Sequence, residues 1–166
     1  MGGITKTERL LGVFHLFRYC REVSFKEVTD QIPVSKKTVY RDIRLLKQIG
    51  YRIDFSRERR AFVISRESSV PRFPENKTQR KYLGKILRLT AIMAEMSEAD
   101  DPVVWYRDQF PELSVRTMQR DFATLNAVGY RVIYERESYD PDYPTGKYRC
   151  EWPDSTYSLE LFYRGK

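Results

Sequence analysis

The N-terminal third of the chain shows apolar positions at helical spacing, followed by a motif that caps a helix. A helix is expected from Thr7 to about Cys20, because Leu10, Phe14 and Phe17 lie on one stripe at about 3.6 residues per turn. The segment Ser24–Glu27 fits a capping box, in which Ser and Glu satisfy free backbone N–H groups, so a second helix is expected from Ser24. The pattern therefore predicts two helices in the first third of the chain.

A third helix and a hairpin are expected next. Ser35 is suited to cap this helix, and Gly50 is suited to end it in the left-handed conformation. Its apolar positions are Val39, Ile43, Leu46 and Ile49. Residues 51–55 and 61–64 alternate as strands on either side of a turn at 57–60. The order is helix, helix, tight turn, helix and hairpin, which is the order of a winged helix-turn-helix.

The chain contains an internal repeat. Residues 34–58 and 113–137 are identical at ten of 25 positions with an offset of 79. The apolar stripe also recurs, as Met118, Phe122, Leu125 and Val128. A weaker upstream match, of residues 6–9 with 77–80, has an offset of 71, which predicts extra residues in the second copy around 97–102. The alternating segment 157–163 is expected to add a strand to the second sheet.

Charge distinguishes the two copies. The chain has 30 Lys and Arg, 23 Asp and Glu, and a net charge of +7. Residues 1–76 hold 16 basic and 9 acidic residues, whereas residues 77–166 hold 14 of each, so the whole excess lies in the first part. Residues 65–76 contain two Pro and three Ser and are typical of a linker. We expect an α+β chain with a basic winged helix-turn-helix at 1–66, a linker at 67–76 and a neutral winged helix-turn-helix at 77–166.

The composition of the chain excludes several classes of protein. No apolar run approaches the roughly 20 residues of a membrane span, and no secretory signal is visible. One His and two Cys do not make a zinc site, and no catalytic constellation stands out, so no cofactor, metal or enzymatic activity is expected. A cytoplasmic protein with a basic surface remains, for which nucleic acid is the first partner to consider.

The stretch from Val34 to Gly50, VSKKTVYRDIRLLKQIG, resembles the recognition helix of bacterial DeoR-type and WYL-type transcriptional regulators. The resemblance covers about residues 5–64 well, and 78–152 more weakly through 113–130. It implies a winged helix-turn-helix that binds DNA. In those families, one winged helix is followed in the chain by a larger ligand-binding or WYL domain. Here a second winged helix is expected in place of that domain.

Helix geometry and the resemblance together select the residues expected to contact DNA. At 100° per residue, one face of the third helix lies opposite the apolar stripe and would enter the major groove, with the helix N-terminus suited to phosphate. Arginines at the hairpin tip suit the DNA backbone or a minor groove. The expected contacts are Ser35, Lys36, Lys37, Thr38, Tyr40, Arg41, Arg44, Gln48, Arg57, Arg59 and Arg60, and in the second copy Ser114, Arg116, Thr117, Gln119 and Arg120.

The second copy is a weaker candidate for DNA contact. Ala123 and Ala127 replace Arg44 and Gln48, and the expected wing at 138–146 has two Asp and no basic residue. It is therefore expected to bind either a second DNA half-site or a protein partner, which includes a second copy of the chain. The function expected of the whole is sequence-specific binding of double-stranded DNA in transcription regulation. A protein-interaction module and a tandem winged-helix replication initiator are the alternatives.

Some polar residues are expected to be structural. Asp42 and Asp121 lie beside the core stripe, where each carboxylate is expected to pair with a basic group or a backbone N–H. Arg52 and Arg131 suit internal pairing and phosphate contact equally. His15 is expected to be a surface or core residue without a chemical role. Cys20 and Cys150 are expected to be ordinary thiols, with a redox switch as the alternative.

Overall fold

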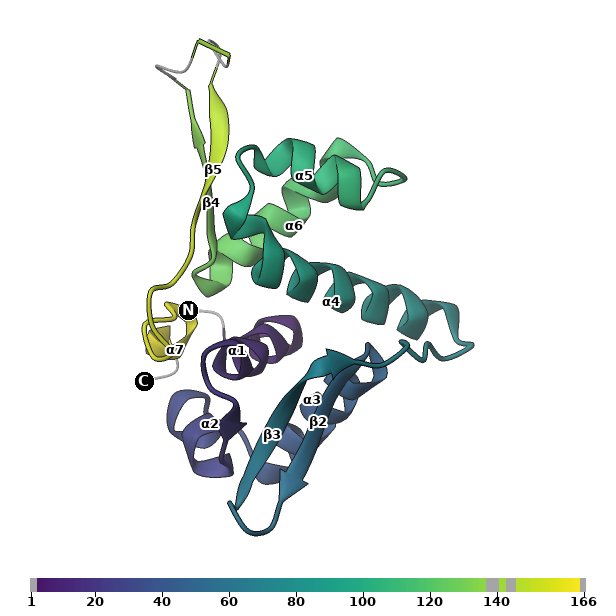
Figure 1. Ribbon diagram of the computed structural model, residues 1–166, viewed down its shortest axis with the longest axis vertical. Helices are drawn as coiled ribbons and strands as arrows, with labels where there is room; N and C mark the ends of the chain where they lie inside the picture. Colours follow the sequence, from purple (N-terminus) through teal and green to yellow (C-terminus); the bar gives the residue numbers. More distant parts are fainter. Residues whose placement is uncertain (1–2, 137–140, 143–145, 165–166) are drawn as a thin grey trace.

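The computed structural model describes residues 3–136, 141–142 and 146–164, and it has an α+β architecture with two small antiparallel sheets (Figure 1). The same order of three helices followed by a hairpin occurs twice, from α1 to β3 and from α4 to β5. The elements are α1 (Lys6–Tyr19), β1 (Glu22–Val23), α2 (Phe25–Gln31), α3 (Lys36–Gln48), β2 (Tyr51–Ser56), β3 (Ala61–Ser68), α4 (Lys77–Glu95), the 3-10 helix η1 (Met96–Glu98), α5 (Pro102–Gln109), α6 (Val115–Val128), β4 (Arg131–Glu135), β5 (Lys147–Glu151) and α7 (Leu161–Arg164).

The helices of the first copy begin where the sequence predicts. Ser24 and Glu27 form the expected capping box at α2, and Ser35 accepts a hydrogen bond from the backbone N–H of Thr38 at the start of α3. Gly50 follows α3 with a φ of 112°, in the left-handed region that only glycine adopts without strain. These local signals therefore set the length and the direction of α3.

The apolar stripes of α3 and α6 form the core as predicted. All eight residues expected on these stripes are at most 4% exposed. The expected hairpin in the first copy is also confirmed, since β2 and β3 pair around a turn at 57–60. The two-residue strand β1 extends this sheet by pairing Glu22 with Val63. The second sheet holds only β4 and β5.

Each copy contains a buried ion pair between its first and third helix. In the first copy, Nη2 of Arg9 donates to Oδ1 of Asp42 over 3.0 Å, and in the second, Nη2 of Arg88 donates to Oδ1 of Asp121 over 3.0 Å. Nε of each arginine donates to the other carboxylate oxygen, so both pairs are bidentate. Asp42 and Asp121 are each 1% exposed, and the expectation of a paired carboxylate is confirmed.

The same ion pairs correct the expected alignment of the first helices. Arg88 lies 79 positions after Arg9, so the offset of the repeat core also holds for α1 and α4. The match of residues 6–9 with 77–80 therefore does not align equivalent residues. The expectation of extra residues around 97–102 is wrong. The extra residues lie at the N-terminal end of α4, in residues 77–84, because Asn76 caps that helix about two turns earlier.

The expectation of a strand at 157–163 is wrong. These residues lead into the short helix α7, which packs on α1. Leu159, Leu161 and Phe162 are fully buried, and a Cβ at Gly12 of α1 would lie only 2.9 Å from Cδ2 of Leu161. The apolar residues of this segment therefore cover the first copy rather than extending the sheet of the second.

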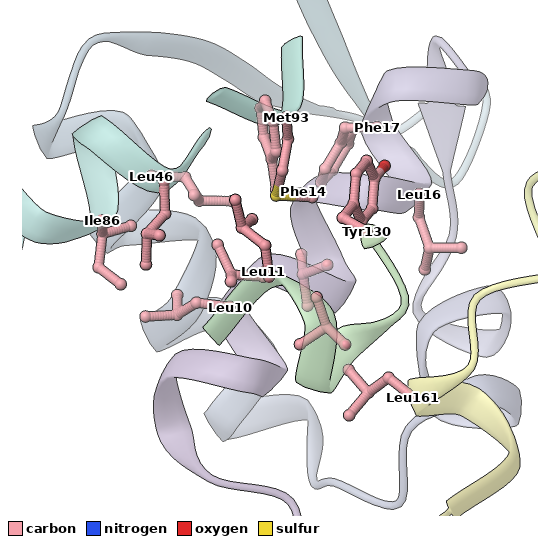
Figure 2. Close-up of a cluster of buried hydrophobic side chains, with 14 of the residues drawn as sticks. Leu10, Leu11, Phe14, Leu16, Phe17, Leu46, Ile86, Met93, Tyr130 and Leu161 are labelled. Carbon is pink, nitrogen blue, oxygen red and sulfur yellow. The ribbon is translucent and has the colours of Figure 1, made fainter. Parts of the chain in front are cut away.

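The two copies share one hydrophobic core, in which α1 contacts α3, α4, α6 and α7. Figure 2 shows Met93 and Tyr130 of the second copy near Phe14 of α1, and Ile86 of α4 near Leu46 of α3. The copies are therefore packed against each other.

The connection between the copies is also held in place. β3 extends to Ser68, the N–H of Ser69 donates to the carbonyl of Gly50 over 2.7 Å, and the N–H of Arg72 donates to that of Gln48 over 2.7 Å. Residues 65–68 of the expected linker therefore belong to a strand, and residues 69 and 72 are held against the end of α3. No helix in the described ranges has both the length and the apolar character needed to cross a membrane.

Candidate nucleic-acid interface

The outward face of α3 presents basic side chains away from the core. Lys37, Arg41 and Arg44 are exposed, and none of them has an ion-pair partner among the residues that the structure describes. Gln48, at the C-terminal end of the same face, is half-buried. Since the opposite face of α3 forms the core, its buried residues fix the direction in which these cations project. The face is therefore free to bind an anionic partner.

The N-terminal turn of α3 is ordered by its own hydroxyl groups. Oγ of Ser35 lies 3.2 Å from Oγ1 of Thr38, and it also accepts from the backbone N–H of Thr38. Lys36 is exposed and lies over the ring of Phe25, 5.4 Å from its centre. The positive end of the helix dipole and Lys36 both favour an anion at this turn.

Tyr40 differs from the other residues of the outward face because its ring belongs to an aromatic cluster. The ring contacts Phe25 at 4.8 Å and Phe62 at 5.7 Å between centres, and Phe55 of β2 completes the cluster. Tyr40 and Phe55 nevertheless remain 49% and 43% exposed. These aromatic side chains therefore join α3 to the hairpin and leave apolar edges at the surface beside the cations.

A groove of about 740 Å³ runs between α3 and the hairpin. Arg44 and Gln48 line it together with Lys47 and Arg72, which were not among the expected contacts. Lys47 could have been predicted from the sequence as part of this surface, because at 100° per residue it lies next to Tyr40 on the helix. Arg72 could not have been predicted from the sequence, since it reaches the groove only through the backbone hydrogen bond between residue 72 and the end of α3.

The hairpin tip adds further cations near this face. Arg57 and Arg60 are exposed and make no ion pair within the described part of the chain. Arg59 is instead paired with Glu22 of β1. Two of the three expected arginines of the tip are therefore unpaired, and the third stabilises the edge of the sheet.

The outward face of α6 repeats part of this arrangement. Arg116, Gln119 and Arg120 are exposed, and the two arginines have no ion-pair partner in the described ranges. Ser114 caps α6 and lies 3.1 Å from Oγ1 of Thr117, as Ser35 does with Thr38. Ala123 and Ala127 are exposed where α3 has Arg44 and Gln48. The face of α6 is thus less basic than that of α3 and has shorter side chains at these two positions.

In the hairpin of the second copy, Arg136 is the equivalent of Arg57 and is likewise exposed, with no ion pair among the described residues. Arg149 of β5 is paired with Glu135 and lies 3.9 Å from Glu151. Most of the expected wing, including Asp140, lies outside the described residues. Arg52 and Arg131, for which two roles were open, each form an internal pair, with Glu67 at 3.0 Å and with Glu160 at 3.4 Å.

The two buried ion pairs shift the pKa values of their arginines. The hydrogen bond with Asp42 raises the pKa of Arg9. The pKa of Arg88 is also raised, because its pairing with Asp121 outweighs the opposing effect of burial. These arginines remain charged and hold α3 and α6 on their first helices.

Comparisons of the chain with protein-family models, with curated proteins and with solved structures gave no match.

Proposed function

We propose that the chain is a tandem winged helix-turn-helix protein that binds double-stranded DNA sequence-specifically and regulates transcription. The observation that supports this most directly is the outward face of α3. Lys37, Arg41 and Arg44 project from a capped helix whose other face is buried, and they have no protein partner in the described ranges. The proposal also draws on the resemblance of residues 34–50 to DeoR-type and WYL-type recognition helices.

Double-stranded DNA suits this face better than other anionic partners. The major groove accepts one α-helix, and Arg or Lys can hydrogen-bond O6 and N7 of guanine, while Gln can bond adenine. Arg41, Arg44 and Gln48 are then the base-reading residues of α3. Lys36 and the N-terminal N–H groups of α3 contact phosphate, and Arg57 and Arg60 at the hairpin tip contact the DNA backbone.

The second copy has a smaller part in this proposal. Arg116 and Arg120 contact a second half-site, and the exposed Ala123 and Ala127 permit a close approach of α6 to the bases. The first copy supplies most of the electrostatic affinity because all of the net charge of +7 lies in residues 1–76.

Selection of bound duplexes from random and genomic DNA tests the proposal. The wild-type chain should enrich a two-part motif, and Arg44→Ala should relax one part. Lys81→Ala provides a control, since Lys81 is an exposed cation on α4 outside both faces. No enriched motif, with only salt-sensitive binding to every duplex, would refute sequence-specific regulation. A motif and an affinity unchanged by Arg120→Ala would assign α6 to a protein partner.

A further inference from the structure

Two tyrosines at equivalent positions of the repeat each contact the first helix of the other copy. Tyr51 directly follows Gly50, and its hydroxyl donates to Oγ1 of Thr90 on α4 over 2.8 Å. Tyr130 directly follows Gly129, and its hydroxyl lies 2.5 Å from Nδ1 of His15 on α1. Tyr51 and Tyr130 are 79 residues apart, which is the offset of the repeat. The contacts between the copies are therefore reciprocal.

This reciprocity is approximate rather than exact. The residue of α1 equivalent to Thr90 is Leu11, and His15 lies one helical turn beyond it. The central contact is between α1 and α4, which are the equivalent first helices of the two copies. A contact between equivalent elements, flanked by reciprocal contacts, is the pattern of a two-fold relation and not of a translation.

The reciprocal contacts determine how α3 and α6 point. Both tyrosines lie just after the C-terminal ends of these helices, so both C-terminal ends adjoin the α1–α4 pair. Figure 1 shows α3 and α6 on opposite sides of that pair. Their N-terminal ends, at Ser35 and Ser114, therefore face away from the centre. Two copies related by a translation would instead point both N-terminal ends in the same direction.

The relation between the copies is also rigid. His15 is fully buried between them, with Nε2 hydrogen-bonded to the carbonyl of Thr156 over 2.9 Å. Leu11, Met93 and Phe162 are fully buried in the shared core. Because changing the angle between α3 and α6 would expose this core to water, the distance between the two outward faces is fixed.

We propose that α3 and α6 bind the two halves of one inverted DNA site with a single permitted spacing. This inference rests on the proposed function. In helix-turn-helix proteins the symmetry of the site mirrors that of the protein, so a two-fold relation requires inverted halves. The outward faces differ at two equivalent pairs of positions, Arg44 with Ala123 and Gln48 with Ala127. The two halves of the natural site therefore differ in sequence, and the natural site does not read as an inverted repeat.

A variant that makes the two faces alike reveals the orientation. Arg116→Lys, Gln119→Tyr, Ala123→Arg and Ala127→Gln together place the α3 residues on α6, at positions that are all exposed. Selection from random DNA with this full-length variant should yield the α3 half-site twice, as an inverted repeat. A direct repeat, or one half-site alone, would overturn the inference.

The converse variant guards against a misfolded product. Lys37→Arg, Tyr40→Gln, Arg44→Ala and Gln48→Ala place the α6 residues on α3, and this variant should select the α6 half-site twice, again inverted. Circular dichroism and thermal unfolding establish that each variant is folded. If neither folded variant selects an inverted repeat while the wild-type chain selects a motif, the inference fails and the proposed function stands.

Spacing provides a second readout. Inserting about five base pairs, half a helical turn, between the natural halves should reduce affinity to that of one half-site, and inserting about ten should not restore it. Affinity that recovers with about ten inserted base pairs would show that the copies separate on DNA and would overturn the fixed spacing. A wild-type chain that selects no motif would instead refute the proposed function itself.

Discussion

The hydroxyl group of Tyr130 donates a hydrogen bond to Nδ1 of His15 across the boundary between the two copies, with 2.5 Å between the oxygen and the nitrogen. The carbonyl of Thr156 can only accept, so Nε2 of His15 is the protonated ring nitrogen and Nδ1 is the acceptor. Nη1 of Arg18 donates to the same tyrosine oxygen over 3.0 Å. Arg18, Tyr130, His15 and Thr156 thus form one directed chain of hydrogen bonds that requires a neutral imidazole.

Stability is expected to fall in mild acid because of His15. Burial lowers the pKa of His15 from 6.5 to about 4. Above pH 6.5 the ring is neutral in the folded and the unfolded chain, whereas between about pH 6.5 and 4 only the unfolded chain binds the proton. Folding should therefore lose up to about 3 kcal/mol over this range, since one pKa unit corresponds to about 1.4 kcal/mol. Urea unfolding at several pH values measures the loss.

His15→Gln is the control for this loss. Its side chain does not titrate, so the variant should be less stable at pH 8 but should lose less stability between pH 6.5 and 5 than the wild-type chain does. Equal losses for both chains would show that His15 is not the source of the acid sensitivity.

Breaking either buried ion pair should be costly. Arg9→Ala leaves the carboxylate of Asp42 buried without its partner, and Arg88→Ala does the same to Asp121. Each variant is expected to lose about 3 kcal/mol of unfolding free energy in urea. Lys26→Ala, which removes the exposed pair with Asp30, serves as the control and should produce no measurable change. A loss as small as that of the control would contradict a structural role for the buried pairs.

Two glycine substitutions should have opposite effects. At Gly50, φ is 112° and a Cβ would lie 2.6 Å from the backbone oxygen of Ser69, so Gly50→Ala should cost about 2 kcal/mol or more. At Gly84 in α4 a Cβ meets nothing within 4 Å, so Gly84→Ala should gain about 0.5–1 kcal/mol through helix propensity. Thermal unfolding measures both. A stabilising Gly50→Ala would show that the turn after α3 is not held as described.

Residues that contact the DNA backbone and residues that contact bases should affect the salt dependence of DNA binding differently. Arg57→Ala and Arg60→Ala at the hairpin tip should weaken binding to all duplexes alike and reduce the slope of log affinity against log salt by about one each. Arg44→Ala should instead reduce the preference for the selected motif by about tenfold or more. Filter binding at several salt concentrations distinguishes them. A hairpin variant that changes the preferred sequence would contradict this division.

The local signals in the sequence predicted most of the fold. Ser24, Ser35 and Gly50 determine helix ends through hydrogen bonds and φ values within a few residues, and the stripes of α3 and α6 follow from helical spacing. The outward face of α3 was predictable for the same reason, because burial of one face places the others at the surface.

Features that depend on contacts distant in sequence were not predictable. The apolar residues of 157–163 fit a strand as well as a buried coil and helix, and only the space beside Gly12 favours the latter. The partners of Asp42 and Asp121 were unknown because a chance match at residues 77–80 obscured the true equivalence of Arg9 and Arg88. Arg72 enters the groove beside α3 only after the connection between the copies has folded back.

The most direct test of the central claim, that α3 and α6 both contact DNA, is hydroxyl-radical footprinting on the selected duplex. Two separate protected segments are predicted for the wild-type chain. Arg44→Ala should weaken protection of one segment and Arg120→Ala that of the other, while Lys81→Ala should leave both intact. A single protected segment, or protection that neither Arg44→Ala nor Arg120→Ala alters, would contradict the account.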